Sequence, residues 1–152
     1  MNTENRDREI VFTRWISAPA REIWNAWTNP DSLAQWFGPN GFTVTTHEAV
    51  MKQGGNWTYT MHGPDKIDYP NHMAYSTFVP PSRLEYDHAE IPGDEPICHT
   101  TVTMEDHGSR TRFTMQMLFP SMQARDEIIS QCNAIEGGNQ TLDRLEAFLS
   151  NA

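Results

Sequence analysis

The pattern of apolar and polar residues divides the chain into a strand, two short helices, a run of strands and a final helix. The stretch from Glu9 to Ser17 is rich in β-branched and aromatic residues, which predicts the first strand. Prolines at positions 19 and 30 each follow a capping position, taken as Ser17 or Ala18 for the first and Asn29 for the second, so each predicts a helix start. The first helix is expected to present Ile23, Trp24 and Trp27 on one face.

From residue 42 onward the sequence consists of strand-like segments separated by turn residues. These segments are 42–50, 56–61, 71–79, 83–88, 97–106 and 109–119. In the last of them Phe113, Met115 and Met117 alternate with Arg112 and Gln116. Such alternation is typical of an antiparallel sheet with one covered side.

The C-terminal part of the chain carries an apolar stripe at helical spacing. The stripe consists of Met122, Ile128, Ile129, Cys132, Ile135, Leu142, Leu145, Phe148 and Leu149. Gly137 and Gly138 interrupt it, and each glycine costs a helix about 1 kcal/mol relative to alanine. We expect one helix that passes through the glycines or bends at them, because they would let it approach Trp24 or Trp27. The part before Gly137 should overhang a pocket, and the part after Gly138 should grip the sheet.

These elements predict an α+β fold in which one curved antiparallel sheet of about six or seven strands wraps around a long C-terminal helix. Two short helices follow the first strand. The 152 residues predict a single domain, with its core at about 9–149. A single helix is too narrow to fill the concave side of such a sheet. We therefore expect a cavity for a small hydrophobic or amphipathic molecule.

Several motifs extend over almost the whole chain: "APAREIWNAWTNPDSLAQWFGPNGF" at 18–42, "GGNWTYTMHGPD" at 54–65 and "AIEGGNQTLDRLEAFL" at 134–149. With them the chain resembles the START-like (SRPBCC, helix-grip) superfamily, in the branch similar to the C-terminal domain of the activator of heat-shock protein 90 ATPase. The resemblance implies the helix-grip fold. It also implies two alternatives to ligand binding: a co-chaperone or stress-response interaction module, and an enzyme of the polyketide cyclase or dehydratase type. For the enzyme, the candidate inward polar groups are Tyr59, Tyr75 and Glu48.

The composition favours non-catalytic binding of a ligand. Five Trp, seven Phe, four Tyr and eight Met provide wide rings and pliable thioethers, which suit a surface that closes around an irregular molecule. The predicted cavity lining consists of Trp24, Trp27, Trp36, Phe37, Trp57, Tyr59, Met61, Tyr75, Phe113, Met115, Met117, Ile128 and Cys132. For each of these residues taken alone, an ordinary core position is the competing interpretation.

The net charge and the spacing of motifs disfavour several other classes of function. The net charge of −9 disfavours nucleic acid and anionic membranes as partners, and the N-terminus lacks the order of a signal peptide, so we expect a cytoplasmic protein. Cys98 and Cys132 are then expected to be reduced and buried. The six histidines show no metal-binding spacing, and no nucleophile or phosphate motif is present, so no metal, cofactor or catalytic residue is predicted. Besides the small molecule, a homodimer and a chaperone contact are the expected partners.

Overall fold

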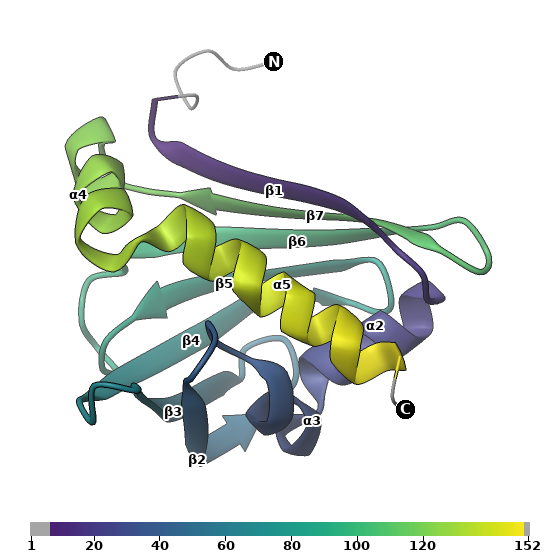
Figure 1. The fold of residues 1–152 in the computed structure, drawn as a ribbon, viewed down its shortest axis with the longest axis horizontal. Helices are drawn as coiled ribbons and strands as arrows, with labels where there is room; N and C mark the ends of the chain where they lie inside the picture. Colours follow the sequence, from purple (N-terminus) through teal and green to yellow (C-terminus); the bar gives the residue numbers. More distant parts are fainter. Residues whose placement is uncertain (1–6, 151–152) are drawn as a thin grey trace.

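The computed structural model describes residues 7–150, which form a seven-stranded antiparallel sheet with the helices on its concave side (Figure 1). The strands are β1 (Glu9–Ile16), β2 (Thr43–Val50), β3 (Asn56–His62), β4 (Asp68–Val79), β5 (Arg83–Ala89), β6 (Cys98–Asp106) and β7 (Thr111–Leu118). The helices are α2 (Ala20–Thr28), α3 (Pro30–Trp36), α4 (Met122–Cys132) and α5 (Ala134–Ser150). The order across the sheet is β1-β7-β6-β5-β4-β3-β2, so β1 and β2 are the edges. The predicted fold is confirmed.

The two short helices begin close to the predicted prolines. Asn29 caps α3 as predicted, because its side chain accepts a hydrogen bond from the backbone N–H of Asp31. The predicted cap of α2 was wrong: Pro19 occupies the N-cap position in an extended conformation, and no side chain caps this helix. The helix therefore begins at Ala20, one residue after the proline. Within the described residues, no helix is both long and apolar enough to cross a membrane.

The C-terminal segment differs from the predicted single helix. Asn133 adopts the left-handed conformation (φ 51°, ψ 48°) and divides the segment into α4 and α5. Asparagine tolerates this conformation better than most residues. The glycines behave as expected in one respect, since Gly137 and Gly138 both lie inside α5. The break at Asn133 changes the phase of the apolar stripe, which leaves Cys132 and Ile135 exposed.

At Gly138 α5 comes very close to the sheet, but the neighbour is not the predicted tryptophan. A Cβ atom at this position would overlap the ring of Phe12, coming within 2.8 Å of its Cε1 atom. Phe12 is a buried, inward-facing residue of β1, and β1 passes beside α5 (Figure 1). The missing side chain therefore makes room for Phe12 rather than for Trp24 or Trp27.

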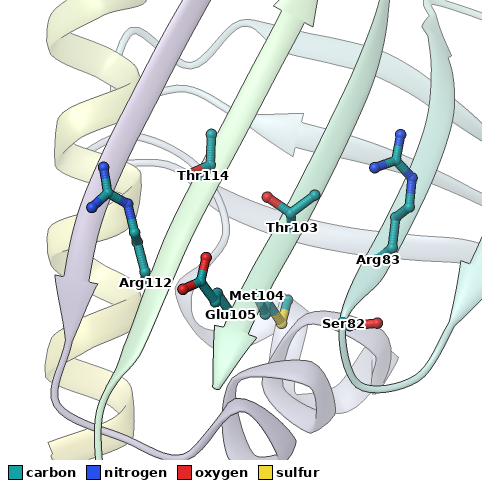
Figure 2. A pocket seen from close by; sticks show the side chains of 7 residues that line it. All are labelled: Ser82, Arg83, Thr103, Met104, Glu105, Arg112 and Thr114. Carbon is teal, nitrogen blue, oxygen red and sulfur yellow. The ribbon is translucent and has the colours of Figure 1, made fainter. Parts of the chain in front are cut away.

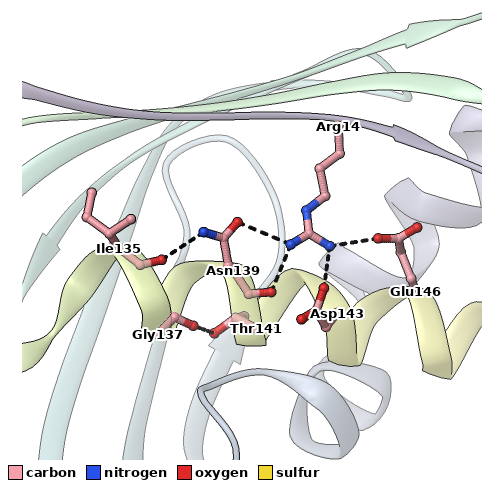
Figure 3. A network of polar contacts seen from close by, with 7 residues as sticks. All are labelled: Arg14, Ile135, Gly137, Asn139, Thr141, Asp143 and Glu146. Atoms are coloured by element: carbon pink, nitrogen blue, oxygen red, sulfur yellow. Dashed lines mark hydrogen bonds and ion pairs between the residues drawn. The ribbon is translucent and has the colours of Figure 1, made fainter.

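Hydrogen bonds and ion pairs from Arg14 also hold α5 against β1, as Figure 3 shows. Its guanidinium donates to the carboxylates of Asp143 and Glu146, both at 2.7 Å, and to the backbone carbonyl of Asn139 at 3.0 Å. Burial alone would lower the pKa of Arg14, but the hydrogen bonds and charges of the two carboxylates raise it. The network joins residues that are more than 120 positions apart and fixes the C-terminal part of α5 against β1.

We expect Arg14→Met to lower the free energy of unfolding by about 1 kcal/mol, because it removes several charge-assisted hydrogen bonds from a partly exposed site. Urea titration at low salt measures the change. Arg21→Met is the matched control, since Arg21 is an exposed residue of α2 outside this network. The difference between the two variants should shrink in 1 M salt, where exposed charges are screened. An equal effect of both substitutions would contradict the role given to the network.

Candidate ligand-binding site

The concave side of the sheet is packed solid at the end covered by α2 and α3. The ring centroids of Trp27 and Trp36 are 4.8 Å apart, those of Trp27 and Phe113 are 5.5 Å apart, and those of Phe37 and Trp57 are 5.2 Å apart. Such separations are those of aromatic side chains in direct contact. This end therefore forms a filled aromatic core.

The other end, beneath α4, is loosely packed. No side chain of α4 is fully buried, although Ile128 and Ile129 face the core. The inward residues Met115 and Met117 of β7 are also only half-buried. By contrast, Leu142 and Leu145 of α5 are completely enclosed. The grip on the sheet is thus tight along α5 and weak along α4.

A pocket of about 240 Å³ opens between α4 and the ends of β6 and β7. It is lined by Pro96, Ile97, Phe119, Pro120, Ala124, Glu127, Ile128 and Gln131. The lining is mainly apolar, and Glu127 and Gln131 are exposed. One water molecule needs about 10–15 Å³ of such space, so the pocket has room for several. This is enough room for a small molecule, and a displacement of α4 would enlarge it.

The predicted lining residues fall into three groups in the structure. Trp24, Trp27, Trp36, Trp57, Tyr59, Tyr75 and Phe113 are buried, whereas Phe37, Met61, Met115, Met117 and Ile128 are half-buried. Cys132 is exposed, so its predicted burial was wrong; Cys98 is buried as expected. Of these residues, Ile128 lines the pocket beneath α4. Ile97, Phe119 and Ala124 were missed, although Phe119 continues the inward alternation of β7 and could have been found from it.

Three buried tyrosines form a polar region on the inner face of β3, β4 and β5. Tyr59, Tyr75 and Tyr86 are 1%, 4% and 2% exposed. Burial raises the pKa of Tyr59 far above its usual range, and the nearby Tyr86, Tyr75 and Cys98 raise it further. Burial likewise raises the pKa of the other two tyrosines. All three phenols therefore stay protonated and can donate hydrogen bonds at neutral pH.

Two further titratable groups near this region, Cys98 and His88, are uncharged at neutral pH. Burial raises the pKa of the Cys98 thiol to about 11. His88 is hydrogen-bonded to Asn71 at 2.6 Å, and although its side chain keeps some exposed surface, desolvation and the neighbouring His72 lower its pKa to about 4. Glu48 does not point inward as predicted for an enzyme. It is exposed beside a bulge of β2, where it accepts a hydrogen bond from Asn56 at 2.7 Å.

A second, shallow pocket of about 350 Å³ lies on the opposite, outer face of the sheet (Figure 2). It is lined by Ser82, Arg83, Thr103, Met104, Glu105, Arg112 and Thr114. Arg83 and Arg112 stand on either side, but Glu105 lies between them and Arg83 already pairs with Glu85 at 2.9 Å. Because charges of both signs line it and Arg83 is already paired, this pocket is a weaker candidate for an apolar molecule than the one beneath α4.

Comparisons with known proteins agree on one family and one fold. The sequence model of the family described as "Activator of Hsp90 ATPase homolog 1-like protein" matches residues 17–150. A crystal structure of a protein from Nitrosomonas europaea is similar over 96% of both chains, with 20% identity and a TM-score of 0.87. A solution structure of a protein from Arthrobacter aurescens covers 99% of this chain and 91% of its own, with 24% identity and a TM-score of 0.86. Among curated protein sequences, none matches this chain.

AHSA1 is the short name of this family, and another similar crystal structure bears it. It is the AHSA1 protein from Silicibacter pomeroyi, which shares 18% identity, with a TM-score of 0.74 over 93% of this chain and 97% of that one. At these identities the solved structures establish the fold alone. Any proposal about function therefore depends on the geometry of the pocket beneath α4.

Proposed function

Because the chain belongs to the family of activator of Hsp90 ATPase homolog 1-like proteins, which have a START-type fold, we propose that it binds a small hydrophobic or amphipathic molecule beneath α4. Family membership supports a ligand-binding or co-chaperone-like module. The observation that favours binding is the loose packing of α4 over the half-buried side chains of β7. A helix whose side chains are at most half-buried can move away from the sheet at smaller energetic cost than one with fully buried side chains.

The proposed binding is non-catalytic. The buried tyrosines stay protonated at neutral pH, so they do not serve as general bases. Glu48, the carboxylate considered for acid–base chemistry, is exposed outside the concave side. Two groups with opposed protonation states, which such an enzyme needs in one site, are not found together among the described inward residues.

Three probes of nearly equal size test the proposal: 4-phenylbutan-2-one, 3-phenylpropanoate and 3-phenylpropan-1-amine. We expect at least one of them to bind the wild-type protein in a chemical-shift titration. Ile128→Trp should abolish that binding, because the indole fills the pocket. Ser130→Trp is the matched control, since Ser130 is an exposed residue of the same helix outside the pocket lining. If none of the three probes binds, or if both tryptophan variants bind as the wild type does, the proposal fails.

A protein contact is the second candidate function, and one surface feature favours it. Val11 and Trp15 of the edge strand β1 are 48% and 43% exposed on the outer face. Arg110 stacks on the Trp15 ring at 4.1 Å from its centroid. We propose this strip for a chaperone contact, and a homodimer is its competing occupant. Capture of purified heat-shock protein 90 by the wild type but not by Trp15→Ser supports the chaperone; a dimer that Trp15→Ser dissociates, seen by sedimentation, supports the homodimer.

A further inference from the structure

The pocket beneath α4 has one ionisable residue in its lining, Glu127. The other lining residues are apolar except for Gln131, and none of the described residues that line the pocket is a lysine, arginine or histidine. Because Glu127 and Gln131 are four positions apart on α4, their side chains lie on the same face of this helix. The polar part of the pocket wall therefore consists of a carboxylate and a neighbouring amide.

The carboxylate of Glu127 has no cationic partner in the part of the chain that the structure describes. The side-chain amide of Gln123 donates a hydrogen bond to it at 3.2 Å, and no ion pair reaches it. The adjacent arginine of α4, Arg125, pairs with Asp126 at 2.8 Å instead. Glu127 can therefore bind a cation of a ligand without the loss of an existing ion pair.

The surroundings of the pocket also favour a positive charge over a negative one. Pro96 and Ile97 of the lining follow the segment 90–95, which contains three acidic residues and no basic one. Arg8 lies outside the lining, and its guanidinium donates to the backbone carbonyl of Phe119 at 3.2 Å. An anionic ligand would thus meet a carboxylate in the pocket wall and no cation there, and like charges brought together weaken binding.

We propose that the ligand beneath α4 is an amphipathic amine, whose apolar body lies against the apolar lining and whose ammonium group binds Glu127. The inference rests on the proposed ligand-binding function and specifies the class of ligand. An ammonium group has three donors, which suffice for the Glu127 carboxylate and the side-chain carbonyl of Gln131. Both side chains are exposed, so the ammonium group keeps part of its hydration while the apolar body is enclosed.

The three probes introduced above test the sign of the ligand charge, because they share a phenyl ring and differ mainly in charge. We expect 3-phenylpropan-1-amine to bind most tightly and 3-phenylpropanoate least tightly. The amine should bind about two- to fivefold more tightly than the neutral ketone, which is the range expected for one exposed ion pair. Chemical-shift titrations at low salt measure the three dissociation constants. In 1 M salt the difference between amine and ketone should shrink, since exposed charges are screened.

Substitutions of Glu127 test the contact itself. Glu127→Gln keeps the size of the side chain and removes its charge, so the amine should lose its advantage while the ketone binds as it does to the wild type. Glu22→Gln is the matched control: it makes the same change at an exposed position of α2, outside the pocket lining, and the preference for the amine should persist. Glu127→Lys should reverse the order, so that the carboxylate binds more tightly than the amine.

The outcomes separate this inference from the function on which it rests. If the wild type binds the ketone or the carboxylate as tightly as the amine, the inference fails and the binding function stands. A preference for the amine that survives Glu127→Gln also overturns the inference, because the carboxylate would then have no part in it. Binding of no probe to the wild type overturns both proposals together.

Discussion

Leu145→Ala is expected to lower the free energy of unfolding by about 2–5 kcal/mol, as truncation of a buried leucine generally does. Leu145 is completely enclosed in the part of α5 that grips the sheet. Ile128→Ala removes a similar amount of apolar side chain from α4, where no residue is fully buried. We expect its effect to be less than about 1 kcal/mol, because little surface is returned to water and the neighbouring chain can relax.

Urea unfolding of the two variants alongside the wild type measures this contrast. The pair is matched in volume and in secondary structure, so the difference reports the packing of each helix. Equal destabilisation by both substitutions would show that α4 grips the sheet as firmly as α5 does. In that case the space beneath α4 could not open for a ligand.

Gly138→Ala is expected to destabilise the protein by about 1–3 kcal/mol relative to Gly137→Ala, which is the usual effect of overpacking a core. Both substitutions gain the same helix propensity, about 1 kcal/mol, because both glycines lie inside α5. At Gly138 the new methyl group overlaps the buried ring of Phe12. At Gly137 its nearest neighbour is the half-buried Pro39, whose Cγ atom lies at 3.3 Å, a contact that a shift of a few tenths of an ångström relieves.

Thermal unfolding of both alanine variants checks this prediction, and a second substitution identifies the cause. Phe12→Leu shortens the side chain beneath the helix, so Gly138→Ala should be less harmful in that background than in the wild type. If Gly138→Ala stabilises the protein as much as Gly137→Ala, then α5 does not need the close approach to β1 at this point.

Much of the fold could be predicted from the sequence because strand alternation and turn residues are local signals. Phe113, Met115 and Met117 share a face simply because β-strands have a period of two, and the structure places all three on the concave side. The prolines located two helix starts for a similarly local reason. The glycine pair indicated a close approach of backbone to neighbour, which the structure shows at Gly138.

The misses share a different physical cause. The residue that Gly138 approaches belongs to β1, and the place of β1 in the sheet is set by a long-range pairing. β1 is the first strand of the chain and pairs with β7, the last one. Asn133 breaks the C-terminal segment although it lies in a helical pattern, because a single left-handed residue leaves almost no trace in apolar spacing. Several aromatic residues predicted to line a cavity pack against one another, and composition alone cannot distinguish a cavity lining from a filled core.

The central claim is that a small molecule binds beneath α4, and intermolecular nuclear Overhauser effects test it most directly. The protein would be labelled at the methyl groups of methionine, isoleucine and valine and saturated with 4-phenylbutan-2-one. We predict contacts from the probe to the methyl groups of Ile97 and Ile128, which line the pocket. Contacts confined to outer-face methyl groups such as those of Val11, or no contacts at saturation, would contradict the claim.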